Sequence, residues 1–404
     1  MDQTGQQQVR RRRVFYIPGY DPIHPRRYRE LYRKESADQA AISGYQIALK
    51  PKKRGSGRYG WHVEAEMDGA ETAADVEVLV WSDIVRDSMD RGIPATYLQL
   101  LRTAWAYIGT GALFRLMRLR KGPIIAALYP IFMLLGQLGL ALIAARLIGA
   151  VLGLSGVPYI GWLGLAVVWP ILKWFKRKDG KFFAYYLMHD YAYSAQYGGE
   201  NPAPLEARMA EFRTTIAAAL QDDVDEVLVV GHSSGAHLAV SILADLLRDG
   251  ALPANGPALA FLSLGQVVPM VSFLPRAERL RRDLRDISRS DALTWVDVTA
   301  PGDGCAFALC DPVSVTGVAP PDKRWPLVIS AAFTQTLSPE RWKELRWRFF
   351  RLHFQYLCAF DRPGDYDYFR ITAGPLTLAA RYAGRQPSKS RIDVAVSGFR
   401  SIAA

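Results

Sequence analysis

Residues 226–237 read EVLVVGHSSGAH, in which an apolar run leads into a glycine-rich turn. The compact apolar run at 227–230 predicts a buried strand, and the apolar residues at 236–248 predict a helix. Between them, GHSSG has the spacing G-x-S-x-G of a tight strand-to-helix turn, where Gly231 and Gly235 lack the Cβ atoms that would clash. Such a turn lifts the hydroxyl of Ser233 clear of the sheet, and the helix N-terminus directs backbone amides towards it. Ser233 is therefore a candidate nucleophile.

On both sides of this turn, short apolar runs alternate with amphipathic segments. The sequence predicts strands at 13–18, 76–82, 258–264 and 294–299, a hairpin at 45–50 and 59–67, and helices at 26–41, 204–220 and 276–289. Such alternation is typical of β-α units that build a sheet covered by helices. We therefore expect the α/β fold class, with a mostly parallel sheet flanked by helices.

A long apolar run interrupts this alternation, because residues 122–172 contain a single charged residue, Arg146. One membrane-spanning helix needs about 20 residues, so this run accommodates two, and the glycine, serine and proline at 153–158 mark the turn. We expect an inserted two-helix membrane hairpin with spans near 127–152 and 157–174. Two alternatives stay open: a buried helical pair in a large soluble core, and an apolar lid lying flat on a membrane.

Basic residues flank the apolar run on both sides. They are Arg115, Arg118, Arg120 and Lys121 before it, and Lys173, Lys176, Arg177, Lys178 and Lys181 after it. Because Lys and Arg concentrate in cytoplasmic loops, we expect a multi-pass membrane protein whose two termini and soluble parts are cytoplasmic. Trp162, Trp169 and Trp174 suit the interfacial belts of such spans. Residues 97–120 predict either an amphipathic helix on the lipid surface or an ordinary packed helix.

The predicted organisation has four segments. Residues 1–97 supply the first part of the sheet, 98–181 the lead-in and the hairpin, 182–387 the second part with the GHSSG turn, and 388–404 a weakly patterned tail. The polar and basic start of the chain does not resemble a cleavable signal peptide. We therefore expect the hairpin to be the targeting element.

The net charge of +11 is concentrated in two places. The flanks of the apolar run carry a net +8 and residues 10–13 a net +4, so the rest of the chain is close to neutral. Anionic lipids attract such clusters, which favours membrane lipids over nucleic acid as the partner. The three cysteines, Cys305, Cys310 and Cys358, form no even disulfide framework and suit a reducing compartment.

With these features, the sequence resembles the α/β-hydrolase superfamily on its lipase and esterase side. The resemblance rests on VFYIPGY at 14–20, EVLVVGHSSGA at 226–236, TWVDVTAPGD at 294–303 and RLHFQYL at 351–357. It covers the chain from residue 14 to about residue 357, interrupted by the apolar run. It implies a serine nucleophile at Ser233, followed along the chain by an acid and then a histidine.

Two histidines follow Ser233 in the sequence. His237 lies in the helix that leaves the turn, so we interpret it as a helix-surface histidine that points away from the serine. His353 is then the candidate catalytic histidine, by elimination and by chain order.

The resemblance places the acid in the turn after a late strand, where a carboxylate can orient the imidazole. Asp303, just past the strand at 294–299, fits best, and Asp311 is the alternative acid. Asp297 lies inside that strand, and we interpret it as structural.

The resemblance also implies two backbone amides that stabilise the oxyanion formed during acyl transfer. One belongs to Ser234, which follows the nucleophile. The other belongs to the loop at 19–21, with Tyr20 as the candidate. Many relatives carry His-Gly in this loop, where this chain has Pro18-Gly19.

We expect no metal and no cofactor. His189 and Asp190 lie in the tyrosine-rich stretch 182–197 without further ligands at regular spacing, so we interpret them as part of a juxtamembrane packing segment. Cys305 and Cys310 have no partner histidine or cysteine pair in the sequence for zinc.

Two functional hypotheses follow. The first is a membrane-anchored serine hydrolase that cleaves acyl esters, including lipid esters, through an acyl-enzyme on Ser233. The second is a non-catalytic membrane scaffold or binding protein that keeps the hydrolase fold. Because the sequence supplies both an acid and a histidine, it favours the enzyme. A peptidase or an acyltransferase would use the same three residues.

Overall fold

One eight-stranded sheet forms the centre of the molecule. The computed structural model describes residues 8–403 except 53–56 and 254. The strands lie in the order β2-β3-β4-β1-β5-β6-β7-β8. They are β1 Arg11–Ile17, β2 Gln46–Pro51, β3 Gly60–Met67, β4 Ala70–Val78, β5 Glu226–His232, β6 Ala258–Leu264, β7 Thr294–Thr299 and β8 Leu327–Ser330. The β2–β3 and β3–β4 pairs are antiparallel and the other pairs are parallel, which confirms the predicted mostly parallel α/β sheet.

The middle of the sheet is formed by β1 and β5. Val14 of β1 pairs with Val76 of β4 on one side and with Leu228 of β5 on the other. Every residue of β5 is buried, because helices cover both faces of the sheet, and this explains its continuous apolar run. The strand predicted at 76–82 begins earlier and ends at Val78, because the chain then turns into α2, Ser82–Met89.

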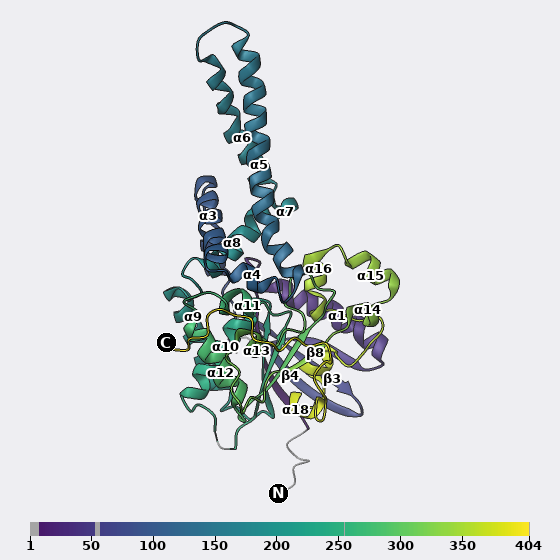
Figure 1. Ribbon diagram of the computed structural model, residues 1–404. Coiled ribbons are helices and arrows are strands. Elements are labelled where there is room, and N and C mark those ends of the chain that lie inside the picture. Colours follow the sequence, from purple (N-terminus) through teal and green to yellow (C-terminus); the bar gives the residue numbers. More distant parts are fainter. Residues whose placement is uncertain (1–7, 53–56, 254, 404) are drawn as a thin grey trace.

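Helices cover both faces of the sheet (Figure 1). One face packs against α1 (Arg26–Ser43) and a series of short helices near the C-terminus. The other face packs against α2, α9 (Ala203–Ala219), α10 (Gly235–Arg248) and α12 (Glu278–Arg289). The short helices on the first face are α14 Phe333–Thr336, α15 Pro339–Leu345, α16 Phe349–His353, η2 Gln355–Leu357, α17 Tyr368–Ala373 and α18 Leu378–Arg381. Two more, α11 Val268–Ser272 and α13 Pro312–Thr316, pack on the second face. The tail from residue 388 contains neither helix nor strand over 388–403, as far as the structure describes it.

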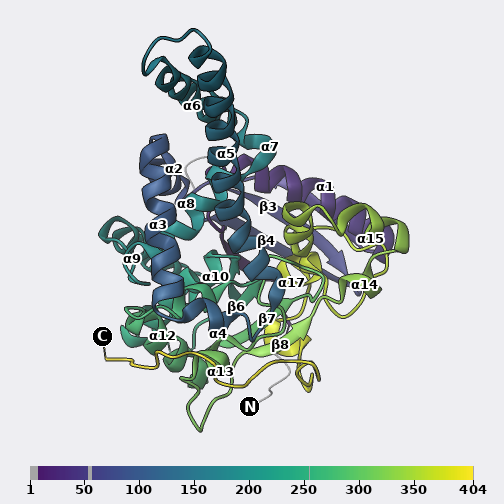
Figure 2. The same ribbon diagram turned by 45° about the horizontal axis from the view of Figure 1, so that its top comes forward.

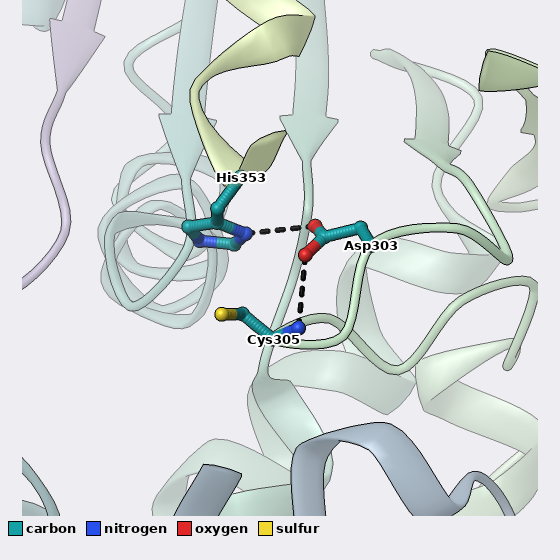
Figure 3. A group of neighbouring side chains, drawn as sticks. All are labelled: Asp303, Cys305 and His353. Atoms are coloured by element: carbon teal, nitrogen blue, oxygen red, sulfur yellow. Dashed lines mark hydrogen bonds and ion pairs between the residues drawn. The ribbon is translucent and has the colours of Figure 1, made fainter. Parts of the chain in front are cut away.

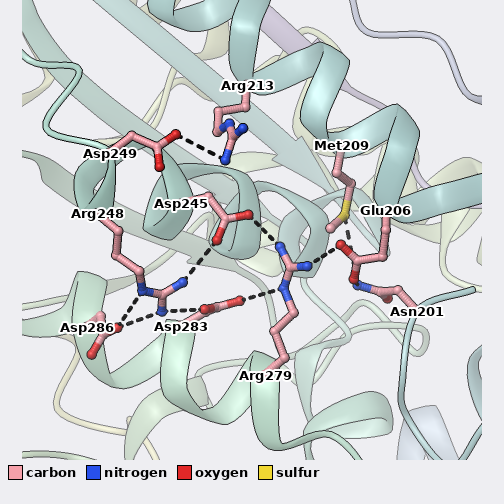
Figure 4. Close-up of polar contacts among 10 residues, drawn as sticks. All are labelled: Asn201, Glu206, Met209, Arg213, Asp245, Arg248, Asp249, Arg279, Asp283 and Asp286. Carbon is pink, nitrogen blue, oxygen red and sulfur yellow. Dashed lines mark hydrogen bonds and ion pairs between the residues drawn. The ribbon is translucent and has the colours of Figure 1, made fainter. Parts of the chain in front are cut away.

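Two arginines link α9, α10 and α12 through ion pairs (Figure 4). Arg279 of α12 binds Glu206 of α9 and lies 2.6 Å from Asp245 of α10. Arg248 of α10 lies 2.5 Å from the buried Asp283 of α12. Exposed pairs contribute less than about 1 kcal/mol each, but a shared network around a buried carboxylate holds these helices in register.

An arm of helices is inserted between β4 and β5 and projects away from the sheet (Figures 1 and 2). Its elements are α3 Ile93–Gly109, α4 Ala112–Leu116, α5 Lys121–Gly153, η1 Ile160–Val167, α6 Val168–Arg177, α7 Asp179–Phe182 and α8 Ala184–Ala195. The helix predicted at 127–152 therefore begins earlier, at Lys121. The helix predicted at 157–174 is not one continuous α-helix, because its first half is the 3₁₀ helix η1 and its second half is α6.

One described helix, α5, is long and apolar enough to cross a membrane by length and composition. Its most apolar window has a mean hydropathy of 2.1, and only 22% of that window is buried in the fold. The alternative of a buried core helix does not account for α5, since such a helix would be mostly enclosed by protein.

The arm has two limbs, α5 on the outward course of the chain and η1 with α6 on its return. These two limbs pack against each other through glycines. A Cβ atom on Gly164 would lie 2.2 Å from the carbonyl oxygen of Ala145, and one on Gly149 would lie 2.4 Å from the carbonyl oxygen of Gly161. Small residues allow such close approach of helix backbones. The large side chains of the limbs consequently point outward; Leu147, for example, is 63% exposed.

The base of the arm lies over the carboxyl ends of the parallel strands. Arg120 donates to the carbonyl oxygen of Ala308, at 2.7 Å, in the loop after β7. The hydroxyl of Tyr186 in α8 donates to the carbonyl oxygen of Tyr20, at 2.5 Å, in the loop after β1. The arm therefore contacts the two loops in which the candidate acid and the candidate oxyanion donor were predicted.

The lead-in predicted at 97–120 forms α3 and α4, and α3 is a packed helix with an exposed apolar side, so that the lipid-surface interpretation stays a prediction. On α3, Leu100 and Tyr107 are buried against the arm and the sheet domain. On its other side, Trp105 is 78% exposed and Leu101 is 64% exposed. The helix is thus packed along one face and presents large apolar side chains along the other.

Candidate active site

Ser233 occupies a strained turn between β5 and α10. Its φ is +57°, a left-handed conformation that costs a non-glycine residue about 1–2 kcal/mol. The N–H of Ser233 donates to the carbonyl oxygen of Leu264, at 2.9 Å, which fixes the turn against β6. The side chain is partly exposed at the end of a fully buried strand.

Close contacts explain the glycines around Ser233. A Cβ atom on Gly235 would lie 2.1 Å from the carbonyl oxygen of Ile17 at the end of β1. A Cβ atom on Gly231 would lie 2.7 Å from the Cα of Ala236. Gly19 is also in close contact, since its Cβ would lie 2.9 Å from the Cβ of Ser233. The loop after β1 therefore lies directly against the candidate nucleophile.

Asp303 and His353 are brought together from positions 50 residues apart (Figure 3). Asp303 follows β7, His353 ends α16, and His353 Nδ1 lies 2.7 Å from Asp303 Oδ2. The same oxygen accepts a hydrogen bond from the hydroxyl of Tyr356, at 3.0 Å. The other oxygen accepts the backbone N–H of Cys305, at 2.9 Å. Three donors therefore hold one buried carboxylate.

These contacts keep Asp303 ionised. Burial alone would raise the pKa of its carboxyl group, but the electrostatic interaction with His353 and the hydrogen bonds from His353, Cys305 and Tyr356 outweigh it. The pKa of Asp303 consequently lies below its ordinary value. An ionised Asp303 accepts the Nδ1 proton of His353, and this tautomer leaves Nε2 as a proton acceptor.

The imidazole of His353 lies beside the serine turn. Its ring centroid is 4.8 Å from that of His232, the neighbour of Ser233, and His232 Nε2 lies 3.0 Å from the carbonyl oxygen of His353. A Cβ atom on Gly265 would lie 3.0 Å from His353 Cε1. His353 Nε2 is buried and has no hydrogen-bond partner among the described residues. The nitrogen that would take a proton from a nucleophile is thus free.

Within the described part of the chain, no hydrogen bond joins Ser233 to His353. Catalytic hydrogen bonds are often long before substrate binds and shorten in the Michaelis complex. His232, whose pKa burial lowers to about 3, is neutral and already bonded to the backbone of His353. His232 therefore contacts both the backbone and the ring of His353.

The two amides predicted for the oxyanion border the serine turn. Ser234 precedes α10, and Tyr20 follows Gly19 in the loop that touches Ser233. Neither N–H donates a hydrogen bond to any residue that the structure describes. The side chain of Tyr20 is bonded elsewhere, to Ser88 Oγ at 2.5 Å. Both amides are therefore available to a ligand.

The other two candidate acids have structural contacts. Asp311 caps α13 by accepting the N–H groups of Val313 and Ser314, and it pairs with Lys323 at 2.5 Å. Asp297 is buried inside β7 and accepts a hydrogen bond from Ser263 at 2.6 Å. Neither one contacts His353, so the geometry favours Asp303 over the alternative Asp311.

For two residues, His237 and Cys305, the environment that we expected from the sequence was wrong. His237 is buried, although we interpreted it as a helix-surface histidine, because the segments at 190–202 cover the start of α10. Cys305 does have a histidine neighbour, since the ligand atoms of Asp303, Cys305 and His353 lie within 4.8 Å of one another. Spacing along the chain does not reveal either contact.

The group of Asp303, Cys305 and His353 offers three ligand atoms but fits zinc poorly. Burial and the charge of Asp303 raise the pKa of the Cys305 thiol, which opposes the thiolate that zinc binds. His353 Nδ1 and Asp303 are also engaged with each other. This donor set suits a hydrogen-bonded acid–histidine pair better than a metal centre.

Asp190 is a residue near this site that the sequence interpretation missed. It lies on α8 at the base of the arm and forms no hydrogen bond or ion pair with a described residue. Tyr186, Asp190 and Tyr193 follow one another at the i, i+4, i+7 spacing of one helix face, which was the available signal. The chain matches no protein-family model, no curated protein and no solved structure.

Proposed function

We propose that this protein is a membrane-anchored serine hydrolase that cleaves carboxylic acyl esters. The observation that carries the proposal is the pair of Asp303 and His353, with its free Nε2, beside a serine held at a φ of +57°. An ionised acid, an oriented imidazole and a strained serine are the parts that nucleophilic acyl transfer requires.

The proposed reaction has two halves. His353 Nε2 takes the proton of Ser233 Oγ as the oxygen attacks the ester carbonyl carbon, and the amides of Ser234 and Tyr20 stabilise the oxyanion. The C–O bond to the alcohol then breaks, and His353 returns the proton to the departing alcohol. Water repeats these steps on the acyl-enzyme, releasing the carboxylic acid and restoring Ser233. Asp303 stays ionised throughout and orients the imidazole.

The experiment that tests this proposal is covalent labelling of the full-length protein with a fluorophosphonate probe. We expect the wild type to be labelled at Ser233 and the Ser233→Ala variant to be unlabelled. Ser234→Ala is the matched control, since it removes the neighbouring hydroxyl and keeps the backbone amide. Unlabelled wild type, or equal labelling of Ser233→Ala, would overturn the proposal and favour a non-catalytic scaffold.

The anchor in this proposal is the arm formed by α5, η1 and α6. At about 1.5 Å per residue, α5 is about 50 Å long, more than a hydrocarbon core of about 30 Å requires. The returning limb, residues 160–177, reaches about 31 Å, because 3₁₀ residues rise by about 2.0 Å each. The two limbs can therefore reach the same depth, although the second is not one α-helix.

Charge supports the same placement. Lys176 and Arg177 lie at the end of α6, and Arg120 and Lys121 lie at the start of α5, so the cations gather at the base of the arm. Anionic cytoplasmic lipids attract such a collar. Arg146 is exposed two turns before α5 ends, where its long side chain can extend to the far interface. Both termini then lie on the cytoplasmic side, together with the sheet.

A further inference from the structure

A pocket beside the proposed oxyanion site is not used by the hydrolytic mechanism. Its walls include Tyr20, Trp81, Asp190, Tyr193, Ser234 and His237. The loop after β1 and the serine turn form one side, and α8 at the base of the arm forms the other. Because Ser234 and Tyr20 also supply the proposed oxyanion amides, a group bound in this pocket lies next to the reacting ester.

The pocket contains polar groups that lack partners. His237 Nδ1 and the hydroxyl of Tyr193 are buried and bind no residue in the described part of the chain. His237 as a whole is only 8% exposed. The carboxyl group of Asp190 likewise has no hydrogen-bond or ion-pair partner among the described residues. A buried polar group without a partner costs about 1–3 kcal/mol, so these two buried atoms, beside the unpaired and partly exposed carboxyl group of Asp190, indicate a polar ligand.

Charges around the pocket favour an uncharged ligand. Burial lowers the pKa of His237 to about 4, so its imidazole is neutral at pH 7. Burial raises the pKa of Asp190 to about 7, although the charge of His353 opposes this effect. The acidic Glu200 at the rim is already paired with Arg276 at 2.5 Å. A full cation would meet little fixed negative charge here, and an anion would meet no arginine or lysine among the residues that line the pocket.

We propose that this pocket binds the hydroxyl groups of the substrate's alcohol portion, so that the preferred esters are those of polyols such as glycerol. The inference rests on the proposed function and adds the substrate class. Hydroxyl groups both donate and accept, which matches Asp190, Tyr193 and His237 together. An acyl chain in the same place would leave all three polar groups unsatisfied.

The first test measures binding without hydrolysis, in the Ser233→Ala background. The probes are 1-O-butylglycerol, an ether that cannot be hydrolysed, and 1-butoxypropane, which has the same skeleton without hydroxyls. We expect the glycerol ether to bind more tightly. Asp190→Ala and Tyr193→Phe should each weaken its binding about 5- to 10-fold, which corresponds to one lost hydrogen bond. Asp190→Asn, which still donates and accepts, should stay within about 2-fold.

The matched control is Glu200→Gln, at the exposed rim of the same pocket, which should not change the affinity for either ether. Equal binding of the two ethers by the parent, or an unchanged affinity in both Asp190→Ala and Tyr193→Phe, would overturn the inference.

The second test uses the active enzyme and compares kcat/KM for monobutyryl glycerol with kcat/KM for propyl butyrate. We expect wild type to prefer the glycerol ester and Asp190→Ala to lose this preference. Loss of labelling in the wild type would refute the proposed function, whereas the ether-binding test would still report on the pocket. Normal labelling without a preference for the glycerol ester would refute the inference alone.

Discussion

At the scale of single residues, the hydrogen bond between Asp303 and His353 carries most of the argument. It sets which nitrogen of His353 holds a proton, because Nδ1 faces a carboxylate that three donors keep ionised. The contacts of Asp303 with Cys305 and Tyr356 could not be read from spacing alone, since they depend on how the loop after β7 folds back.

Asp303→Asn should lower kcat for ester hydrolysis by roughly 10³–10⁴-fold with little change in fold. An amide in this position can donate to Nδ1, which puts the proton on Nε2 and removes the general base. Steady-state hydrolysis and circular dichroism measure the two effects. Asp311→Ala is the control: it should cost about 1 kcal/mol of stability through loss of the α13 cap and leave kcat within about 2-fold. A larger kcat loss in Asp311→Ala would reverse the assignment of the acid.

Asp297→Asn should stabilise the protein at high pH. Burial raises the pKa of Asp297 to about 8, whereas a carboxyl in the unfolded chain has an ordinary value near 4. The folded state therefore retains a proton that the unfolded state releases between about pH 4 and pH 8, and wild-type stability falls as pH rises through this window. The variant lacks this penalty and should gain about 2–5 kcal/mol on wild type between pH 4.5 and pH 8.5.

Thermal unfolding at the two pH values measures this gain. Asp393→Asn, at an exposed ion pair with Arg391, should show the same change in stability between the two pH values as wild type. If the stability of Asp297→Asn changed with pH as that of wild type does, the carboxyl group of Asp297 would already be ionised in the folded protein at neutral pH.

At the scale of elements, α8 links the arm to the candidate active site. Asp179 caps this helix by accepting the N–H groups of Tyr185 and Tyr186, at 2.9 and 2.8 Å. Tyr186 then donates to the carbonyl oxygen of Tyr20, and its ring packs 5.8 Å from that of Phe350 on α16, the helix that ends in His353. One side chain of the arm thus touches both the proposed oxyanion loop and the histidine helix.

Tyr186→Phe should slow hydrolysis by about 10-fold, mainly in kcat, because Tyr20, whose N–H is the proposed oxyanion donor, loses the hydrogen bond that holds its carbonyl oxygen while the ring contact with Phe350 is kept. Removal of a whole oxyanion donor costs about 10²–10³-fold, which sets an upper limit. Tyr185→Phe is the matched control, since the hydroxyl of Tyr185 has no partner among the described residues. Equal kcat values for the two variants would show that α8 does not position the loop.

The elements were the part of the fold that the sequence predicted best. The strands at 258–264 and 294–299 and the helix at 26–41 were predicted to within a few residues, because each depends on local periodicity. The burial of His237, the contact between Cys305 and His353, and the pocket around Asp190 were missed. Each of these arises where segments far apart in the chain meet, and an apolar or polar pattern along one segment does not report its neighbours.

At the scale of the whole molecule, the arm presents a continuous apolar surface that the rest of the protein does not cover. Leu140 and Ile143 on α5 are 53% and 60% exposed. The sheet, by contrast, has covered faces and an ion-paired helical surface. The molecule therefore divides into a part that suits water and a part that suits a hydrocarbon environment.

The double variant Leu140→Arg and Ile143→Arg should move the protein from the membrane pellet to the soluble fraction after a carbonate wash. Each arginine costs about 2.5–3.5 kcal/mol of insertion free energy near the middle of a span. Because both positions are exposed on the arm, the substitutions should not destabilise the folded sheet domain. Ile23→Arg, at an exposed position near the start of α1, should stay in the pellet with wild type. Retention of the double variant in the pellet would contradict a membrane role for the arm.

The position of the arm within the connection from β4 to β5 has a consequence for biosynthesis. β1 lies between β4 and β5, so one edge of β1 stays unpaired until residues 79–225 have left the ribosome. An open strand edge is prone to pair with other chains, and closing so long a connection is slow. The arm is thus complete before the serine turn exists. If the arm is the anchor proposed above, a chain synthesised at a bilayer would complete the proposed serine site only after that anchor is in place, and the proposed hydrolase would be confined to that surface from the start.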